Sequence, residues 1–294
     1  MKFGIQIDHV IKLTNLRFAD DVILTAQSYS DIKKMLNDLS KHASMYGLLL
    51  NFKKTKVMTW DTLSRRCPPI PVGSQLVSIL DEIESERYLG RKLSLEYCQM
   101  TELRNRIAAG WAAFHKHKAE LCNKFYHLRD RIKLFEAVVS PSVLYGCAAW
   151  ALTQRMEKQL QVARRRMLRY VFRIHRQRSF GRERLEDWVQ FVQYAAHRVD
   201  SIAETGGMEN WVTSARRRKW RFAGVVARQT DGRWSQRLVE WRPFQGHGRS
   251  RGHPKTRWAD SLEKFAGGDW MTLARDKDTW DAYEHPYGSH PPSK

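Results

Sequence analysis

Short segments of mixed apolar and polar residues open the chain in the pattern of paired β-strands. Residues Phe3 to Ile7 and Val10 to Arg17 each have this pattern, and a third apolar run spans Val22 to Leu24. Two adjacent acids, Asp20 and Asp21, lie between the second segment and the third. The sequence therefore predicts a β-ribbon that presents both acids at a strand-to-strand turn.

From Ser30 onward the apolar residues recur at helical spacing instead of strand spacing. Ser30 is the expected N-cap of this helix, and Gly47 is its expected C-terminal stop. The apolar face consists of Ile32, Met35, Leu36, Leu39 and Ala43. Further short strands are expected in residues 48–50, 57–60, 76–80 and 87–89, so that residues 1–95 form an α+β region.

Helical patterns replace the strand signals beyond Gly90. They cover residues 100–121, 127–139 and 157–174. Residues 231–255 are rich in Gly, Arg and Pro, which predicts an extended basic connector, and a short helix is expected at 258–265. The tail from His285 contains three prolines and is expected to be disordered.

The charge of the chain indicates a polyanionic partner. Lys and Arg number 51 against 31 Asp and Glu, which gives a formal net charge of +20 and an isoelectric point near 10.0. The excess is concentrated in residues 101–294, which hold 37 basic and 20 acidic side chains. A surface of this kind is expected of a protein that binds nucleic acid.

The cysteines and the hydropathy favour a soluble intracellular protein of the nucleus or cytoplasm. No C-x-x-C pair occurs among Cys67, Cys98, Cys122 and Cys147, so neither a zinc knuckle nor a secreted disulfide framework is indicated. The longest apolar stretch, Ala137 to Leu152, is interrupted by polar and helix-breaking residues and is shorter than a membrane span. We therefore expect no membrane partner.

Two neighbouring carboxylates at the tip of a ribbon repel each other unless a cation neutralises them. Nucleotidyl transfer uses such carboxylates, held on rigid strands, to bind two Mg²⁺ ions. The alternative is an ordinary solvated turn, and an Asp-Asp pair alone favours that alternative. The residues around the pair change the balance toward a metal site.

Residues 18–21, Phe-Ala-Asp-Asp, resemble the F/Y-x-D-D palm motif of reverse transcriptases, in the Phe-Ala form of non-LTR elements. Residues 47–58 are similar to the G-L-x-x-N-x-x-K-T-x-x-M segment of that family, and residues 88–90 are similar to its Y-L-G primer-grip hairpin. With three motifs in the family's order, residues 1–95 resemble the palm of a non-LTR (LINE-like) retrotransposon reverse transcriptase from the catalytic turn onward.

The resemblance implies a role for each matched residue. Asp20 and Asp21 would be catalytic and would bind Mg²⁺, while Phe18 and Ala19 would shape the turn near the primer terminus. Lys54 would act as a cation near the departing pyrophosphate, with a solvated lysine as the alternative. The hairpin that supports the primer end would contain Tyr88 and Gly90, although Tyr88 is also compatible with simple packing in the sheet.

The family's pattern also includes an upstream strand with another metal-binding Asp, and fingers that hold the template. Only 17 residues precede Phe18, and Asp8 is the one acid among them. We therefore expect weak or absent Mg²⁺ binding by this chain and no appreciable polymerase activity. Association with the upstream portion of a polymerase would be needed to complete the catalytic site, which is incomplete in this chain.

Nine arginines are spread between positions 164 and 184. On a helix, Arg165, Arg169, Arg173 and Arg176 would share one face and could neutralise successive phosphates. The alternative is a merely solvated helix face. Residues 96–175, with the cluster Pro141-x-x-x-Tyr145-Gly146, are similar to the thumb and post-thumb region of non-LTR elements.

Arginines and tryptophans alternate in the last third of the chain. Core packing is the preferred interpretation of the tryptophans, whereas phosphate contact is preferred for Arg249, Arg251, Lys255 and Arg257. The run Arg216 to Arg221 could serve as a nuclear localisation signal.

Taken together, the sequence predicts an α+β protein with a truncated palm (1–95), a helical thumb and post-thumb (96–200), a basic Trp-rich region (201–284) and a disordered tail (285–294). The first functional hypothesis is a fragment of an RNA-directed DNA polymerase, with an RNA template and a DNA primer or target as partners. The alternative is a non-catalytic, basic nucleic-acid-binding protein derived from such an element. Oligomeric state is not indicated by the sequence.

Overall fold

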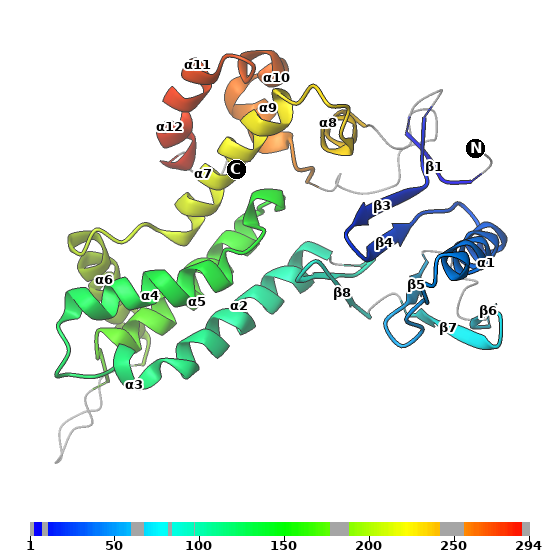
Figure 1. Cartoon of the computed structure of the whole chain (residues 1–294). Coiled ribbons are helices and arrows are strands. Elements are labelled where there is room, and N and C mark those ends of the chain that lie inside the picture. The colour runs from blue at the N-terminus through cyan, green and yellow to red at the C-terminus, as the bar shows by residue number, and fades with distance from the viewer. Residues whose placement is uncertain are drawn as a thin grey trace. The chain divides into compact units, whose positions relative to one another are not determined.

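The computed structural model describes residues 3–7, 11–59, 68–81, 84–96, 98–176, 188–241 and 256–289. It divides into two compact units. Unit 1 comprises residues 1–102 and 231–253, and unit 2 comprises residues 103–230 and 254–294. The strands lie in unit 1 and helices make up the described part of unit 2, so the predicted α+β class is confirmed (Figure 1).

Unit 1 begins with the predicted β-ribbon. β1 (Ile5–Gln6) pairs with β2 (Lys12–Leu13), and β3 (Asn15–Phe18) pairs antiparallel with β4 (Asp21–Leu24). The β3–β4 register joins Phe18 to Asp21, which leaves only Ala19 and Asp20 in the turn. The prediction that the two acids lie at a strand-to-strand turn is therefore confirmed.

Helix α1 (Tyr29–Met45) follows the ribbon and begins two residues earlier than expected. Its N-cap is Ser28, not Ser30, because the Ser28 hydroxyl accepts a hydrogen bond from the Asp31 amide at 3.1 Å. Gly47 ends the helix as predicted, with a φ of +73° that disfavours residues with a side chain. The start was misjudged because Ser28 and Ser30 are equally good caps by residue type.

The core of unit 1 forms between α1 and a three-stranded sheet. β7 (Gln75–Leu80) lies in the centre, parallel to β5 (Lys56–Met58) and antiparallel to β6 (Ile70–Val72). The buried residues of this cluster are Leu36, Ile70, Val72 and Val77. Residues 48–50 form no strand, contrary to expectation, because they follow the left-handed Gly47 and leave Leu48 and Leu49 exposed without a partner strand.

A second hairpin joins β8 (Glu86–Tyr88) to β9 (Arg91–Leu93). Its two turn residues, Leu89 and Gly90, both have positive φ, at +48° and +76°. Two consecutive residues of this kind are typical of the turns that connect β-hairpins most tightly. The predicted strand at 87–89 therefore exists, but it ends at Tyr88 because Leu89 is part of the turn.

Helices account for most of the remaining chain. α2 (Cys98–Lys116) starts in unit 1 and continues into unit 2, and α8 (Trp234–Glu240) belongs to unit 1. The other helices of unit 2 are α3 (Lys118–Leu121), α4 (Leu128–Val143), the short 3-10 helix η2 (Cys147–Ala149), α5 (Gln154–Val171), α6 (Trp188–Thr205), α7 (Trp211–Ala227), α9 (Asp260–Ala266), α10 (Trp270–Leu273), α11 (Lys277–Ala282) and α12 (Glu284–Ser289).

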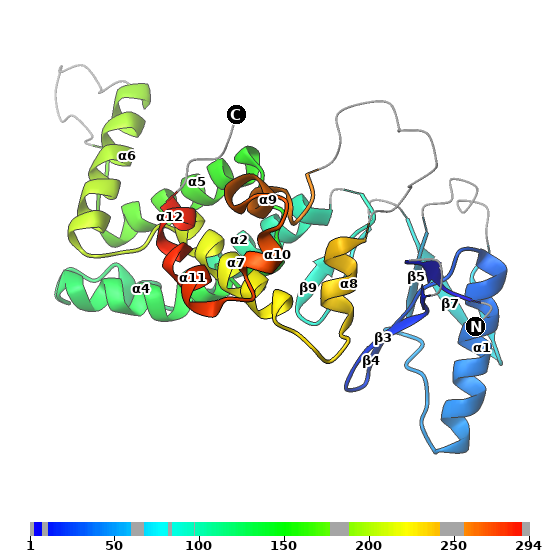
Figure 2. The same cartoon turned by 90° about the horizontal axis from the view of Figure 1, so that it is seen from above.

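Aromatic side chains fill the core of unit 2, as the preferred interpretation of the tryptophans required. Trp211 stacks on Phe135 with ring centroids 5.9 Å apart, and its indole N–H donates to the Ser140 hydroxyl at 2.8 Å. Helices α10, α11 and α12 pack against α7 (Figure 2). There Trp220 and Trp280 stack almost in parallel, with centroids 3.6 Å apart.

Two expectations about the second half of the chain are wrong. Residues 234–240 form α8 within the segment expected to be an extended connector, and residues 284–289 form α12 where a disordered tail was expected. Helix α12 is ordered because Tyr287 is buried and its ring packs on Trp220 with a centroid distance of 4.7 Å. Within the described residues, no helix is both long enough and apolar enough to cross a membrane.

Candidate functional site

The acidic hairpin of unit 1, formed by β3 and β4, exposes its two carboxylates to solvent. Asp20 and Asp21 are exposed, and the Phe18 side chain beside them is 64% exposed. The two-residue connection forces Ala19 into the left-handed region, with a φ of +51°. For a residue with a Cβ this conformation costs about 1 kcal/mol or more, and strain of this kind is common at functional sites.

Tyr88 of the second hairpin lies within electrostatic reach of the first. Burial raises the pKa of the Tyr88 phenol, and the negative charge of Asp21 raises it further. Two motifs that are 67 positions apart in the sequence therefore share one region of unit 1. Gly90 lies in the turn that directly follows Tyr88.

Lys54 is held in a tight turn after α1. Its backbone amide donates to the Asn51 carbonyl at 3.0 Å and to the Asn51 side chain at 3.2 Å, while the Lys54 side chain is exposed. Among the described residues no contact joins Lys54 to either carboxylate of the hairpin. The assignment of Lys54 to the acidic site stays a prediction.

The hairpin offers Mg²⁺ the right type of ligand, carboxylate oxygen, but too few ligands to fill its coordination shell. Carboxylate oxygens are the ligands that Mg²⁺ prefers, and its octahedral shell needs six of them or waters in their place. Across the part of the chain that the structure describes, no cluster of three or more His, Cys, Asp or Glu side chains could hold a metal ion. Asp20 and Asp21 would therefore leave most of the coordination shell to water.

The expected arginine row does not form on one helix. Helix α5 ends at Val171, because Arg173 has a φ of +58° and the Ile174 amide turns back to the Arg169 carbonyl at 2.9 Å. Arg173 and Arg176 thus lie beyond the helix. The prediction that Arg165, Arg169, Arg173 and Arg176 share one helical face is wrong.

The two arginines of this row that remain on α5 have partners inside unit 2. Arg165 binds Asp200 of α6 with two nitrogens, at 3.0 Å from Nε and 2.6 Å from Nη2 to Oδ2. Arg169 lies over the rings of Tyr170 and Phe191, at 5.7 and 5.6 Å from their centroids. These side chains join α5 to α6, and Arg165 is neutralised by its carboxylate.

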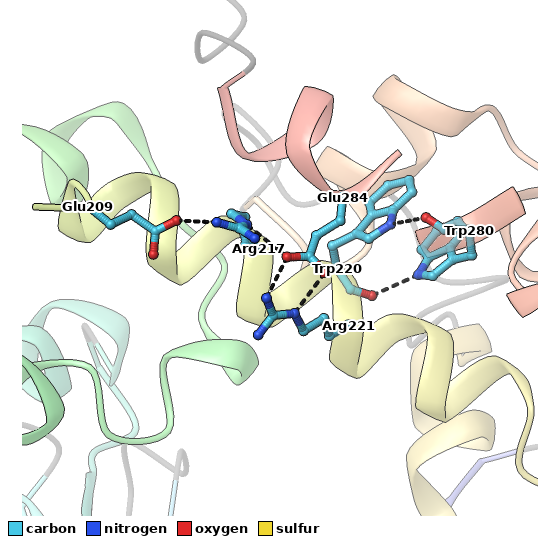
Figure 3. A network of polar contacts seen from close by, with 6 residues as sticks. All are labelled: Glu209, Arg217, Trp220, Arg221, Trp280 and Glu284. Carbon is cyan, nitrogen blue, oxygen red and sulfur yellow. Dashed lines mark hydrogen bonds and ion pairs between the residues drawn. The ribbon is translucent and has the colours of Figure 1, made fainter. Parts of the chain in front are cut away.

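Three of the four arginines in the basic run at 216–221 bind carboxylates. Arg216 binds Glu157 at 2.6 Å. Arg217 and Arg221 both bind Glu284 of α12 (Figure 3). Arg217 binds Glu209 as well, at 2.7 Å. These ion pairs hold α12 and α5 on α7, whereas Arg218 and Arg221 remain exposed. The localisation signal stays a prediction.

Lys219, within the same run, is buried in unit 2 with only 2% of its surface exposed. Its ammonium donates to the Ser261 hydroxyl at 2.9 Å and lies 5.3 Å from the centroid of the Trp258 ring. Burial lowers the pKa of Lys219 to about 7, and the charge of Asp260 opposes that shift. This lysine is therefore only partly protonated near neutral pH.

Most of the predicted C-terminal phosphate contacts lie outside the described residues. This holds for Arg249, Arg251 and Lys255. Arg257 is described, and its backbone amide donates to the Asp260 carboxylate at 2.7 Å, immediately before α9. The proposed phosphate contact of its side chain stays a prediction.

A cationic groove that the sequence analysis did not identify lies between α2 and α5. It has a volume of about 400 Å³, and Trp111 of α2 lines it together with Arg155, Lys158 and Arg166 of α5. The three cations are separated by three and eight positions, a spacing that places them along one side of a helix. That spacing could have indicated the groove from the sequence. The prediction instead followed the dense cluster of arginines at 164–184 and chose the helix face of Arg165 and Arg169.

Comparison with known proteins gives one informative relative. The chain is 32% identical over 280 residues to a transposon-derived protein of Caenorhabditis elegans, and the match covers 91% of this chain and 94% of the relative. No protein-family model matches the chain. No solved structure matches it either.

Proposed function

This chain belongs to the family of the transposon-derived protein of Caenorhabditis elegans that it matches. Going beyond that transposon origin, we propose that it is the C-terminal part of a non-LTR retrotransposon reverse transcriptase. The observation that carries the proposal is the Phe-Ala-Asp-Asp sequence at the tip of a β-ribbon. The effect of the Asp21 charge on the pKa of Tyr88 supports it, because the two residues belong to separate motifs of the polymerase pattern.

In this proposal each residue of the two hairpins has its own role in metal binding or primer support. Asp20 and Asp21 would bind Mg²⁺, which supplies stabilisation of the attacking and departing oxygens in nucleotidyl transfer. The rigid β3–β4 pairing keeps the carboxylates in place, and the exposed Phe18 ring offers an apolar surface next to them. Tyr88 and Gly90 would support the end of the primer from the β8–β9 hairpin.

The 294 residues by themselves are expected not to synthesise DNA. The described residues contribute one carboxylate pair and no third metal ligand near it. A metal held by two exposed carboxylates is bound weakly and without a fixed geometry. Synthesis would therefore require association with a polymerase portion that contributes a further carboxylate and the template-holding fingers.

Metal-induced broadening of amide resonances tests the proposed hairpin site. Titration of the purified chain with Mn²⁺, used as a paramagnetic substitute for Mg²⁺, should broaden the amide signals of residues 18–22 and of Tyr88 first. The variant Asp20→Asn/Asp21→Asn should abolish that broadening, whereas Asp38→Asn, an exposed acid on α1, should not. Equal broadening at Asp38 and at the hairpin would rule out a specific metal site there.

A second candidate function is nucleic-acid binding without catalysis. It is favoured by the net charge of +20 and by the cations of the α2–α5 groove. Primer extension on an RNA template separates the two functions when the polymerase portion that the first function requires is supplied with the chain. If the Asp20→Asn/Asp21→Asn variant retains every measurable activity and salt-sensitive RNA binding persists, only the binding function remains.

A further inference from the structure

The groove between α2 and α5 lies wholly within unit 2 and combines apolar and cationic surfaces. Ile107 and Trp111 form its α2 side, and Val162, which is 46% exposed, lies on its α5 side. The cations Arg155, Lys158 and Arg166 extend along α5 over eleven positions, which corresponds to roughly 16 Å of helix. Side chains that favour bases and side chains that favour phosphates therefore line one elongated site.

The cations of the groove differ from the neighbouring arginines in having no carboxylate partner. Within the described residues, Arg155, Lys158 and Arg166 form no ion pair, and no acidic residue lines the groove. All three are exposed. Their positive charge is therefore available to an external anion.

Trp111 is held in a fixed orientation by other aromatic side chains of unit 2. Its ring contacts Phe114 and Tyr170 edge-on, with centroid distances of 5.4 and 6.3 Å. His115 stacks against it at 5.6 Å. A half-exposed indole fixed in this way loses little conformational freedom when a flat ring packs against its free surface.

From this arrangement we infer that the α2–α5 groove binds an unpaired strand of nucleic acid. A base would pack on Trp111 and Val162, and the phosphates of the strand would contact Arg155, Lys158 and Arg166. An unpaired strand fits better than a duplex because a duplex keeps its base faces stacked inside and offers only phosphates and groove edges to an apolar surface. The inference rests on the proposed function only in taking nucleic acid as the class of ligand.

Charge removal from the groove provides the main test. Fluorescence anisotropy would compare a 20-nucleotide poly(U) RNA, poly(dT) of the same length and a 20-base-pair duplex, each at several salt concentrations. The variant Arg155→Gln/Lys158→Gln/Arg166→Gln should bind both single strands more weakly, and its plot of log affinity against log salt should be shallower by about 2 for three lost phosphate contacts. Because these side chains are exposed, the substitutions should leave folding intact.

The matched control removes three exposed cations of unit 2 that do not line the groove, as Arg129→Gln/Lys133→Gln/Arg198→Gln. It has the same net charge as the groove variant and should retain binding close to that of the original chain. Equal losses in the two variants would indicate general electrostatic attraction and would overturn the inference. Duplex binding as tight as single-strand binding would overturn it as well.

Substitution of the indole tests base stacking separately from charge. Trp111→Leu should weaken single-strand binding roughly tenfold with an unchanged salt slope, whereas Trp111→Phe should retain most of the affinity. Thermal melting of each variant reports whether unit 2 still folds. If Mn²⁺ still broadens the hairpin signals and the groove variants bind normally, this inference is wrong and the proposed function stands. If Mn²⁺ does not broaden the hairpin signals and the groove variants lose single-strand binding, the proposed metal site is wrong and this inference stands.

Discussion

Gly224 of α7 lies so close to Trp280 of α11 that a Cβ atom added to the glycine would come within 2.7 Å of Trp280 Cδ1 and 2.8 Å of its Nε1. The close approach allows an unusual reciprocal contact. The Trp280 indole N–H donates to the Trp220 carbonyl at 2.9 Å, and the Trp220 indole N–H donates to the Trp280 carbonyl at 2.7 Å (Figure 3). The absence of a side chain at position 224 is therefore a condition for joining α11 to α7.

Gly224→Ala should destabilise unit 2 by about 2 kcal/mol, because the added methyl group would push Trp280 out of its stacked and hydrogen-bonded position. Urea unfolding followed by tryptophan fluorescence measures the change. Gly268→Ala is the matched control, since its Cβ would meet nothing within 4 Å and its φ is not in the left-handed region. Equal stability of the two variants would contradict the packing described for Gly224.

Lys219 should make the stability of unit 2 rise with pH between about 7 and 10.5. Its pKa is lowered to about 7 in the folded chain by burial, against an ordinary value of 10.5. Between these two values the unfolded chain binds a proton that the folded chain does not, so raising the pH favours folding. Below pH 7 both states are protonated and the cost of burying the charge is fully present.

Replacing Lys219 with Met should remove this pH dependence. The variant should be more stable than the original chain at pH 6, by an amount on the order of 3 kcal/mol, and the advantage should shrink by pH 9. Denaturant unfolding at both pH values gives the comparison. A Met variant whose advantage stays constant from pH 6 to pH 9 would show that Lys219 is not the titrating group.

Glu157 and Arg216 form a buried ion pair whose side chains are only 9% and 12% exposed. Glu157→Gln should destabilise unit 2 by about 3 kcal/mol, because it leaves the Arg216 guanidinium buried without its counter-charge. The double variant Glu157→Gln/Arg216→Met should recover much of the loss. A double-mutant cycle measured by urea unfolding checks this, and additive losses would mean that the two residues are not coupled.

Ser28→Ala should destabilise unit 1 by about 1 kcal/mol, because the Asp31 amide at the start of α1 would lose its acceptor. Ser30→Ala is the control, since Ser30 lies inside the first turn of α1 and is exposed. Hydrogen exchange of the first amides of α1 reports the effect locally. Faster exchange in the Ser30 variant than in the Ser28 variant would argue for the cap position expected from the sequence.

Asp21→Asn should lower the pKa of Tyr88, because the substitution removes the negative charge that opposes ionisation of the phenol. Some elevation should remain, since burial is the larger cause of the shift. The titration is followed by NMR of the tyrosine ring carbons between pH 8 and 12. The proximity of the two hairpins would be contradicted by a Tyr88 pKa that does not respond to this substitution.

Features that depend on neighbouring residues in the sequence were predicted well. The turn at Asp20 follows from the apolar segments on either side of it, and the end of α1 at Gly47 follows from one residue's backbone preference. Local pattern was sufficient in these cases because the structure there is decided within a few residues.

Features that depend on distant partners were not predicted. The residues near Arg165 in the sequence give no indication of Asp200, and those near Arg217 give none of Glu284. Arg165 was therefore predicted as a phosphate ligand, and Arg217 was placed in a possible localisation signal. Helix α12 was missed for the same reason, because its order comes from packing against α7 and not from its proline-containing sequence. The α2–α5 groove required the pairing of two helices that are not adjacent in the chain.

Two adjacent arginines on α5, Arg165 and Arg166, have different surroundings. Arg165 meets Asp200 through two nitrogens, a geometry that the planar guanidinium provides and that the single ammonium of a lysine does not. Its neighbour Arg166 lines the groove, where the inferred phosphate contact requires a positive charge that a lysine also supplies. Homologous chains should consequently exchange arginine for lysine freely at position 166 and rarely at position 165.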